Sequence, residues 1–204
     1  MTVLATGDDG VTRCAWAHGT PLYERYHDEE WGRPVRDERG LFERLSLEAF
    51  QSGLSWLIIL RKRSAFREAF AGFDVATVAE FDDDDRTRLM ADAGIVRNQA
   101  KINATIGNAV AAMELRARGE PLADLLWSFA PFDTGAPSSF DEVPASTAAS
   151  TAMAAALKRR GFRFVGPTTC YALMQAVGMV NDHLVGCDAR SGIAEVHTVP
   201  VGGS

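Results

Sequence analysis

Two cysteines and two histidines near opposite ends of the chain are of the types that bind zinc. Cys14 and His27 lie in the N-terminal segment, and His183 and Cys187 lie four residues apart near the C-terminal end. That spacing puts the second pair on one helix face if a helix continues there. Two thiolates and two imidazoles complete a tetrahedral zinc shell with no open position, so the site would be structural. His18 competes with His27, no CxxC pair is present, and two buried thiols beside unrelated histidines are the alternative.

Aromatic side chains gather in the first 56 residues, around the segment YERYHDEEWG. They are Trp16, Tyr23, Tyr26, Trp31 and Trp56. Aromatic residues usually belong to a core. Tyrosine and tryptophan mixed with acidic residues can instead form a pocket that stacks on a flat ring. A cationic ring would gain about 0.5–2 kcal/mol from each aromatic face, so such a pocket favours a positively charged ligand.

Glu48 interrupts the apolar stripe of a predicted helix that Asp37 can cap. It follows Leu45 by three residues and Leu41 by seven, so it shares their helix face. A carboxylate there is costly to bury unless it has a partner or a function. The alternatives are that the helix turns enough for Glu48 to reach water, or that Glu48 pairs with an arginine.

The segment LMADAGIVRNQAKINATIGNA, residues 89–109, predicts a helical hairpin with a tight turn at Gly94. We expect Gly94 to adopt the left-handed conformation that such a turn requires. Asn98 opens the second helix, whose first N–H groups and dipole can bind an anion. Lys101 lies one turn into that helix and could add a positive charge. A plain αα-hairpin without a ligand is the alternative.

Helices must position these groups, because strand-like alternation is almost absent from the sequence. The first two predicted helices run from Asp37 to a break at residues 52–55, and from Trp56 to Phe70. A short helix capped by Asp74 and the two hairpin helices at about 85–112 follow. Three more helices are predicted: one over 122–129, one that ends at Gly161, and one that begins at Pro167. The fold class is all-α, with about eight helices. We expect one helical domain over 12–187, an irregular stretch at 131–147, and flexible ends at 1–11 and 188–204.

Composition narrows the function classes. The net charge of −6 argues against a nucleic-acid partner, although basic runs at 60–67 and 157–164 could hold phosphates or be solvated helix ends. Three cysteines make no disulfide framework. The first twenty residues do not have the pattern of a signal peptide, and no apolar run is long enough to span a membrane. We expect a soluble, cytoplasmic monomer that does not engage a membrane.

Four stretches together resemble the 3-methyladenine DNA glycosylase I family: CAWAHGTPLYERYHDEEWG, LFERLSLEAFQSGLSW, DAGIVRNQAKINATIGNA and LKRRGFRFVGPTTCYALMQAVGMVNDHLVGC. The resemblance extends from about Thr12 to Cys187. It implies a helix-hairpin-helix DNA glycosylase fold whose N- and C-terminal segments are joined by a structural zinc site. It also implies hydrolysis of the N-glycosidic bond of 3-methyladenine in alkylated double-stranded DNA, with free 3-methyladenine as product and no strand cleavage.

The resemblance implies a role for each candidate residue. The zinc ligands fall on Cys14, His27, His183 and Cys187, and the pocket glutamate, which accepts hydrogen bonds from the adenine edge, falls on Glu48. The base-stacking and pocket aromatics fall on Trp16, Tyr23, Tyr26, Trp31 and Trp56. No residue obviously supplies the base that would activate water.

Three further residues are DNA-binding candidates. Gly94 belongs to the hairpin that the resemblance implies. Leu54 is a candidate wedge that fills the gap left by a flipped nucleotide, with ordinary core packing as the alternative. For Lys101 we expect a phosphate contact or solvation rather than service as an amine nucleophile, hence no lyase activity.

Two rival functions compete with this interpretation. One is a non-catalytic helix-hairpin-helix module that binds nucleic-acid backbone and needs no pocket. The other is a zinc hydrolase using HDEE, His27–Glu30, which four protein ligands would leave without a site for an activated water.

Overall fold

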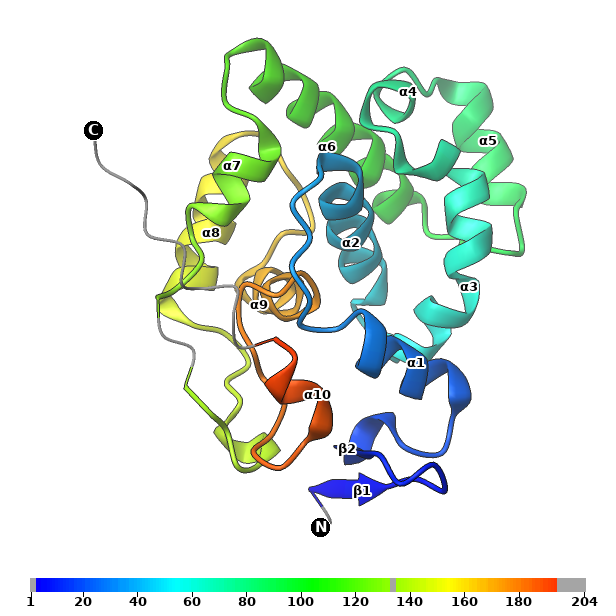
Figure 1. Ribbon diagram of the computed structural model, residues 1–204. Helices are drawn as coiled ribbons and strands as arrows, with labels where there is room; N and C mark the ends of the chain where they lie inside the picture. The colour runs from blue at the N-terminus through cyan, green and yellow to red at the C-terminus, as the bar shows by residue number, and fades with distance from the viewer. Residues whose placement is uncertain (1–2, 133–134, 194–204) are drawn as a thin grey trace. The chain divides into compact units, whose positions relative to one another are not determined.

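The computed structural model describes residues 3–132 and 135–193. Within those ranges it contains ten α-helices, three short 3-10 helices and one two-stranded sheet (Figure 1). The chain is therefore mostly helical, as expected, but the all-α expectation missed the sheet. None of the described helices combines the length and apolar character needed to cross a bilayer.

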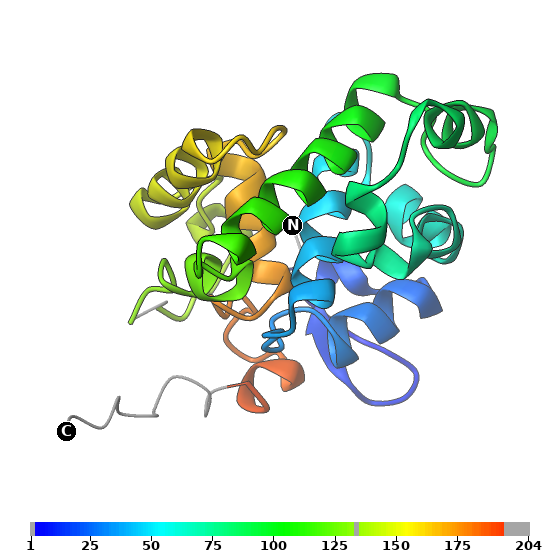
Figure 2. The same ribbon diagram turned by 90° about the horizontal axis from the view of Figure 1, so that it is seen from above.

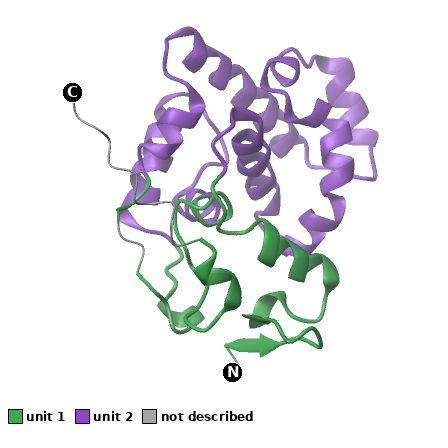
Figure 3. Cartoon of the chain, in the orientation of Figure 1, with its two compact units in different colours: residues 1–34, 130–145, 174–204 green, residues 35–129, 146–173 purple. Residues whose placement is uncertain are grey.

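The helices and strands divide into two compact units, which Figure 3 distinguishes by colour. Unit 1 comprises Met1–Pro34, Ala130–Ala145 and Met174–Ser204. Unit 2 comprises Val35–Phe129 and Ser146–Leu173. We expected one domain over 12–187, whereas unit 1 is assembled from three separate parts of the chain.

Unit 1 begins with a small antiparallel sheet, whose first strand lies in the segment expected to be flexible. Strand β1 (Leu4–Thr6) pairs with β2 (Thr12–Cys14), and Leu4 faces Cys14 in the register. Arg13 stabilises this arrangement because its guanidinium, buried within unit 1, bonds Asp9 at 2.6 Å and Asp28 at 2.7 Å. Strands of three residues carry too little alternation to be read from sequence.

The remaining elements of unit 1 are short. The 3-10 helix η1 (Ala15–Ala17) and helix α1 (Pro21–Glu29) follow the sheet, and η3 (Phe140–Glu142) and α10 (Asp188–Ser191) come later in the chain. Ile193, in the expected flexible tail, is buried. Residues 194–204 of that tail lie outside the described residues.

Helices α2 (Glu38–Gln51) and α3 (Trp56–Ala69) open unit 2 with the predicted break between them. Asp37 caps α2 by accepting a hydrogen bond from the Gly40 N–H at 2.7 Å. Fully buried side chains fix α2 in the core of unit 2, among them Leu41, Phe42, Leu45 and Phe50. The break requires Gly53, whose φ of +83° is costly for other residues.

The elements between α3 and the hairpin are short. The 3-10 helix η2 (Ala71–Phe73) leads to α4 (Val75–Ala79), which Asp74 caps as predicted by accepting from the Thr77 N–H at 3.0 Å.

The predicted hairpin consists of α5 (Asp83–Ala91) and α6 (Gln99–Ala117). Asp82 and Asp85 form a capping box at the start of α5, and Asn98 caps α6 by accepting a hydrogen bond from the Lys101 N–H at 3.1 Å. Helix α6 packs against α2, α4, α5 and α7 (Leu122–Trp127) and appears as the long green helix of unit 2 in Figure 2. It is the element that links the hairpin to α2.

The turn of the hairpin differs from the prediction. Gly94 is not among the residues with positive φ, so the expected left-handed conformation is wrong. A Cβ atom at this position would instead lie 2.9 Å from the Cβ of Ala65 and 2.9 Å from Asp92 Oδ1. Glycine is required here because α3 approaches the turn closely.

Two more helices follow. Helix α8 (Ala148–Arg159) lies within unit 2, is capped by Thr147 and is followed by Gly161, whose φ is +89°. Helix α9 (Pro167–Ala176) begins in unit 2 at the predicted proline and ends beyond Leu173, the last residue of that unit.

Candidate metal cluster and active-site cavity

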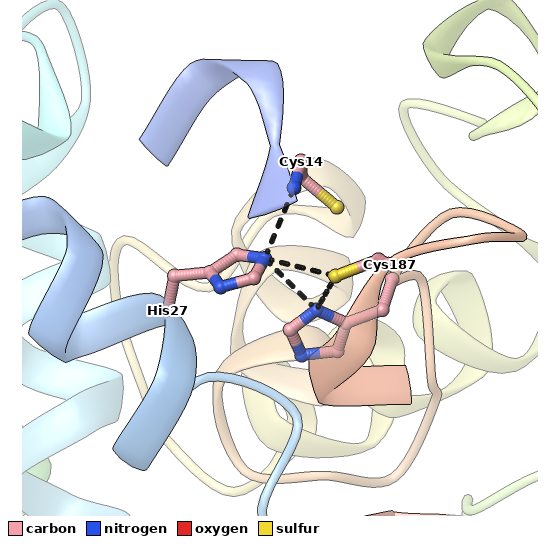
Figure 4. Close-up of side chains that lie close together, drawn as sticks. Cys14, His27 and Cys187 are labelled. Atoms are coloured by element: carbon pink, nitrogen blue, oxygen red, sulfur yellow. Dashed lines mark hydrogen bonds between the residues drawn. The ribbon is translucent and has the colours of Figure 1, made fainter. Parts of the chain in front are cut away.

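Cys14, His27, His183 and Cys187 meet at one point in unit 1. All four residues are buried, and their ligand atoms lie within 4.8 Å of one another. His27 Nε2 is 3.1 Å from His183 Nδ1 and 3.4 Å from Cys187 Sγ. Figure 4 shows the Cys14, His27 and Cys187 side chains directed toward a common centre. His18 is not part of the cluster, which decides between the two histidine candidates.

Hydrogen bonds outside the cluster orient both imidazoles. His27 Nδ1 lies 2.7 Å from Asp28 Oδ1, and Asp28 in turn accepts from Arg13. His183 Nε2 lies 3.1 Å from the Trp31 carbonyl. Both acceptors favour a proton on the outer nitrogen, so both inner nitrogens present lone pairs. The backbone N–H of Cys14 also points at His27 Nε2, at 3.4 Å.

His183 and Cys187 are not on a helix, contrary to the expectation from their spacing. Helix α9 ends at Ala176, and residues 181–184 have no helical structure. Asn181 and Arg190 hold this loop instead: Asn181 Oδ1 accepts from the His183 N–H, and Arg190 donates to the carbonyls of Asn181 and His183. The pair meets because the loop folds back, which a helical rule could not anticipate.

The donor set fits a tetrahedral metal ion. Bonds of about 2.05 Å to nitrogen and 2.3 Å to sulfur place two nitrogens about 3.3 Å apart, and nitrogen and sulfur about 3.6 Å apart. The corresponding separations are 3.1 Å between the imidazoles of His27 and His183, and 3.4 and 3.5 Å from Cys187 Sγ to those imidazoles. The ligand atoms of His27, His183 and Cys187 are therefore spaced as a metal ion requires, and Cys14 Sγ lies within 4.8 Å of them.

The two thiols of the cluster are unequal. A hydrogen bond with Cys14, followed by those with His183 and His27, lowers the pKa of Cys187. The same contact with Cys187, together with burial, raises the pKa of Cys14. These contacts favour ionisation of Cys187 over ionisation of Cys14.

Two of the predicted aromatic residues, Trp16 and Trp31, contact the imidazoles of the cluster, and Tyr23 contacts Trp16. The Trp16 ring meets Tyr23, His27 and Trp31 edge-on, with centroid distances of 5.5, 5.4 and 5.2 Å. Trp31 also meets His183 edge-on at 4.6 Å. These contacts shield the imidazoles from solvent. Of the other two aromatics, Tyr26 is buried on α1 in unit 1, and Trp56 opens α3 in unit 2.

Glu48 lines a cavity of about 330 Å³ in unit 2. The other lining residues are Gln51, Ser52, Gly53, Leu54, Thr168, Thr169 and Ala172. Glu48 is only 6% exposed, and within the described part of the chain no hydrogen bond or ion pair reaches its carboxyl. Both alternatives for this residue, solvation and pairing with an arginine, are therefore wrong. Burial raises the pKa of Glu48 from 4.5 to about 8.

Sequence patterns alone do not indicate the α9 side of this cavity. Thr168 and Thr169 belong to the first turn of α9 and were not candidates. Their only signal is the Pro-Thr-Thr opening of a helix, which is typical of ordinary helix starts.

Two further candidates lie on the turns of unit 2. Leu54 is 37% exposed at the mouth of the cavity, so ordinary core packing is the wrong alternative for it. Lys101 is 7% exposed, and its Nζ donates to the carbonyls of Phe50 at 2.8 Å and Ser52 at 2.6 Å. The expectation that Lys101 could be solvated is wrong, because α2 ends where the lysine side chain can reach its last carbonyls.

Comparison with known proteins places these features in a family. Residues 16–191 match the family model described as methyladenine glycosylase. The chain is 50% identical over 180 residues to DNA-3-methyladenine glycosylase 1 of Escherichia coli (strain K12), which covers 87% of this chain and 96% of that protein.

Solved structures agree with the sequence relatives. A crystal structure of 3-methyladenine DNA glycosylase I is similar with a TM-score of 0.83 and 47% identity, over 86% of this chain and 98% of that one. Another structure, a variant of such an enzyme in complex with 3-methyladenine, has a TM-score of 0.82 and 31% identity, over 87% of this chain and 97% of that one.

Proposed function

Because the chain belongs to the methyladenine glycosylase family, we propose that it is a monofunctional DNA-3-methyladenine glycosylase. It hydrolyses the N-glycosidic bond of 3-methyladenine in alkylated double-stranded DNA, leaves an abasic site, and does not cut the strand. One observation carries the proposal: in this member of the methyladenine glycosylase family, the carboxyl of Glu48 is buried beside a cavity and has no partner among the described residues.

The chemistry follows from the charge of the damaged base. Methylation at N3 makes the purine cationic, so the base can leave as a neutral molecule when the bond to the sugar breaks. Water supplies the hydroxyl group that the sugar carbon gains, and one proton is released to solvent. Because the leaving group is already activated, modest acceleration suffices, and the main task of the protein is to select and hold the base.

Glu48 supplies the selectivity. A pKa of about 8 keeps its carboxyl protonated at neutral pH while the cavity is empty. A cationic ring in the same low-dielectric space favours the ionised carboxylate, whereas neutral adenine does not. We propose that the candidate aromatic residues add stacking on the base, which is stronger for the cation. Extraction of the base from the helix costs a few kcal/mol, and this pairing helps to offset that cost.

DNA contacts complete the proposal. We propose that Leu54 enters the gap left by the flipped nucleotide, since it is exposed at the cavity mouth on a short turn. The α5–α6 hairpin with Gly94 presents the N-terminus of α6 to a backbone phosphate. The protein acts as a monomer in the cytoplasm.

We further propose that the metal is zinc. Cys14, His27, His183 and Cys187 would hold it, and two thiolates would neutralise its charge. With four protein ligands its contribution is structural: it joins the β2–α1 region to the loop before α10. This closed shell is also the reason to reject a zinc hydrolase that uses His27–Glu30.

Incubation of the protein with methylated DNA tests the activity directly. Free 3-methyladenine should appear in the soluble fraction with intact strands, and strand breaks should form only after alkali treatment. DNA that is bound while its methylated bases remain attached would support the passive helix-hairpin-helix module instead.

A further inference from the structure

We infer that Lys101 is a positioning residue of the base-binding site, an inference that rests on the proposed glycosylase function. Its ammonium group ties the first turn of α6 to the end of α2, and thereby fixes the turn that carries Leu54. This role replaces the phosphate contact expected from the sequence.

Lys101 is fixed at both ends. Its backbone N–H donates to Asn98 Oδ1 at 3.1 Å, which anchors the residue in the capped first turn of α6. Its Nζ donates to Phe50 O at 2.8 Å and Ser52 O at 2.6 Å. The Phe50 side chain is itself fully buried. The lysine therefore connects two anchored segments that lie about fifty residues apart in the chain.

The end of α2 has a physical need for such a partner. The last carbonyls of a helix lack intrahelical donors and carry partial negative charge. Ser52, with φ −46° and ψ 114°, terminates α2 abruptly, and Gly53 follows at φ +83°. A buried cation bonded to two of these carbonyls satisfies them and holds the direction in which the chain leaves the helix.

That direction determines the shape of the cavity. Gln51, Ser52, Gly53 and Leu54 are four consecutive residues of its lining, and Glu48 lies one turn earlier on the same helix. The Leu54 N–H closes the turn by donating to Gln51 O at 2.6 Å. Without the lysine, the last turn of α2 and this tight turn lose their common attachment.

Lys62 provides a matched comparison in the same unit. It lies on α3, and its Nζ also donates to two carbonyls, those of Ala93 at 2.9 Å and Gly94 at 3.1 Å. Lys62 thus holds the turn of the α5–α6 hairpin, whereas Lys101, from that hairpin, holds the turn between α2 and α3. The two lysines have the same chemistry, but only Lys101 contacts the turn that lines the cavity.

The same contacts argue against Lys101 as a nucleophile. An amine that attacks a sugar must present a lone pair. Burial lowers the pKa of Lys101, but the two carbonyl acceptors favour the protonated ammonium.

We test the inference with Lys101→Met and Lys62→Met in two measurements. Hydrogen exchange on the free protein should accelerate at residues 51–55 in K101M and at residues 92–95 in K62M. Neither variant should change exchange at the turn that the other lysine holds. Release of 3-methyladenine with protein in excess over DNA should then slow by about tenfold or more in K101M, because small displacements of the groups that position a substrate lower the reaction rate strongly. Affinity of K101M for undamaged DNA should change by less than about twofold, because phosphate contacts are retained.

The outcomes are distinct. Weaker DNA binding by K101M with an unchanged release rate would overturn the inference and favour the phosphate contact expected from the sequence. Unchanged hydrogen exchange at residues 51–55 would also overturn the inference. Borohydride trapping of a covalent adduct of wild type with DNA, lost in K101M, would make Lys101 a nucleophile. If K101M fails to fold, K101Q is measured instead, and because its shorter side chain reaches less far toward Phe50 O and Ser52 O it should show the same changes to a smaller degree. If wild type releases no 3-methyladenine, the proposed function fails. The exchange data still show whether Lys101 holds the end of α2.

Discussion

His27 Nε2 and His183 Nδ1 face each other at 3.1 Å in the interior of unit 1, and each imidazole has its other nitrogen against an oxygen acceptor. Two lone pairs in this position repel unless a proton or a cation lies between them. The thiols of Cys14 and Cys187 complete the surroundings of that point. The cluster could therefore hold a cation at that point.

We expect one zinc ion per chain and a large loss of stability when it is removed. Structural zinc contributes roughly 10 kcal/mol in small domains, and about half of that would lower the Tm by about 10–20 °C at this chain length. Elemental analysis and calorimetry before and after chelation measure both. Cys187→Ser should lose the metal, and Cys170→Ser, a buried cysteine outside the cluster, should keep it. A metal-free protein with unchanged Tm would refute the metal site.

Glu48 should make stability depend on pH in a recognisable window. Its pKa is 4.5 in the unfolded chain and about 8 in the folded protein. The folded state therefore keeps a proton that the unfolded chain releases, and stability falls as pH rises through this window. The slope is about 1.4 kcal/mol per pH unit between the two pKa values.

Glu48→Gln removes that titration, so its stability relative to wild type should rise from about pH 5 to pH 8 and then level off. Denaturant unfolding across this range measures the difference. Glu43→Gln is the control, because Glu43 lies buried on the same helix but pairs with Arg67 at 2.8 Å. A parallel pH dependence in E48Q and wild type would mean that Glu48 is not the buried titrating group.

Leu54→Ala should slow base extraction more than it weakens binding of the free base. Loss of the side chain removes the group that fills the gap in the stack, so we expect about tenfold slower release under single turnover. Affinity for free 3-methyladenine should fall less than the release rate, because Leu54 forms only part of the cavity lining whereas the wedge acts on the DNA. Val110→Ala is the control, since Val110 is similarly exposed, at 40% against 37%, but lies on α6. Equal effects of the two variants would contradict the wedge.

Trp56→Ala should weaken binding of free 3-methyladenine through lost stacking, by about 1 kcal/mol or roughly fivefold in Kd. Fluorescence or calorimetric titration measures this. Unchanged affinity in a folded variant would remove Trp56 from the base-binding site.

Local rules predicted the framework of this fold well. Asp37, Asp74 and Asn98 cap helices as their positions indicated, because a cap depends only on residues two or three positions away. The break after Gln51 and the helix start at Pro167 were equally local. Glu48 was recognised as an anomaly on an apolar face, and its burial confirms that observation.

Features that depend on distant partners were beyond such rules. The short sheet depends on Arg13 bridging Asp9 and Asp28, and Gly94 is glycine because Ala65 of another helix lies against it. Lys101 looked like a surface cation, since nothing in its own helix shows that α2 ends within reach of its ammonium group.

The most direct test compares release of 3-methyladenine and of adenine from methylated DNA by wild type, Glu48→Gln and Glu43→Gln. Wild type and E43Q should release 3-methyladenine with strong preference over adenine. E48Q should lose about tenfold or more of its rate on 3-methyladenine, because a neutral amide cannot pair with the cation, while its DNA affinity stays within about twofold. Full activity and selectivity in folded E48Q would contradict the claim that this buried carboxyl distinguishes the charged base from its neutral counterpart.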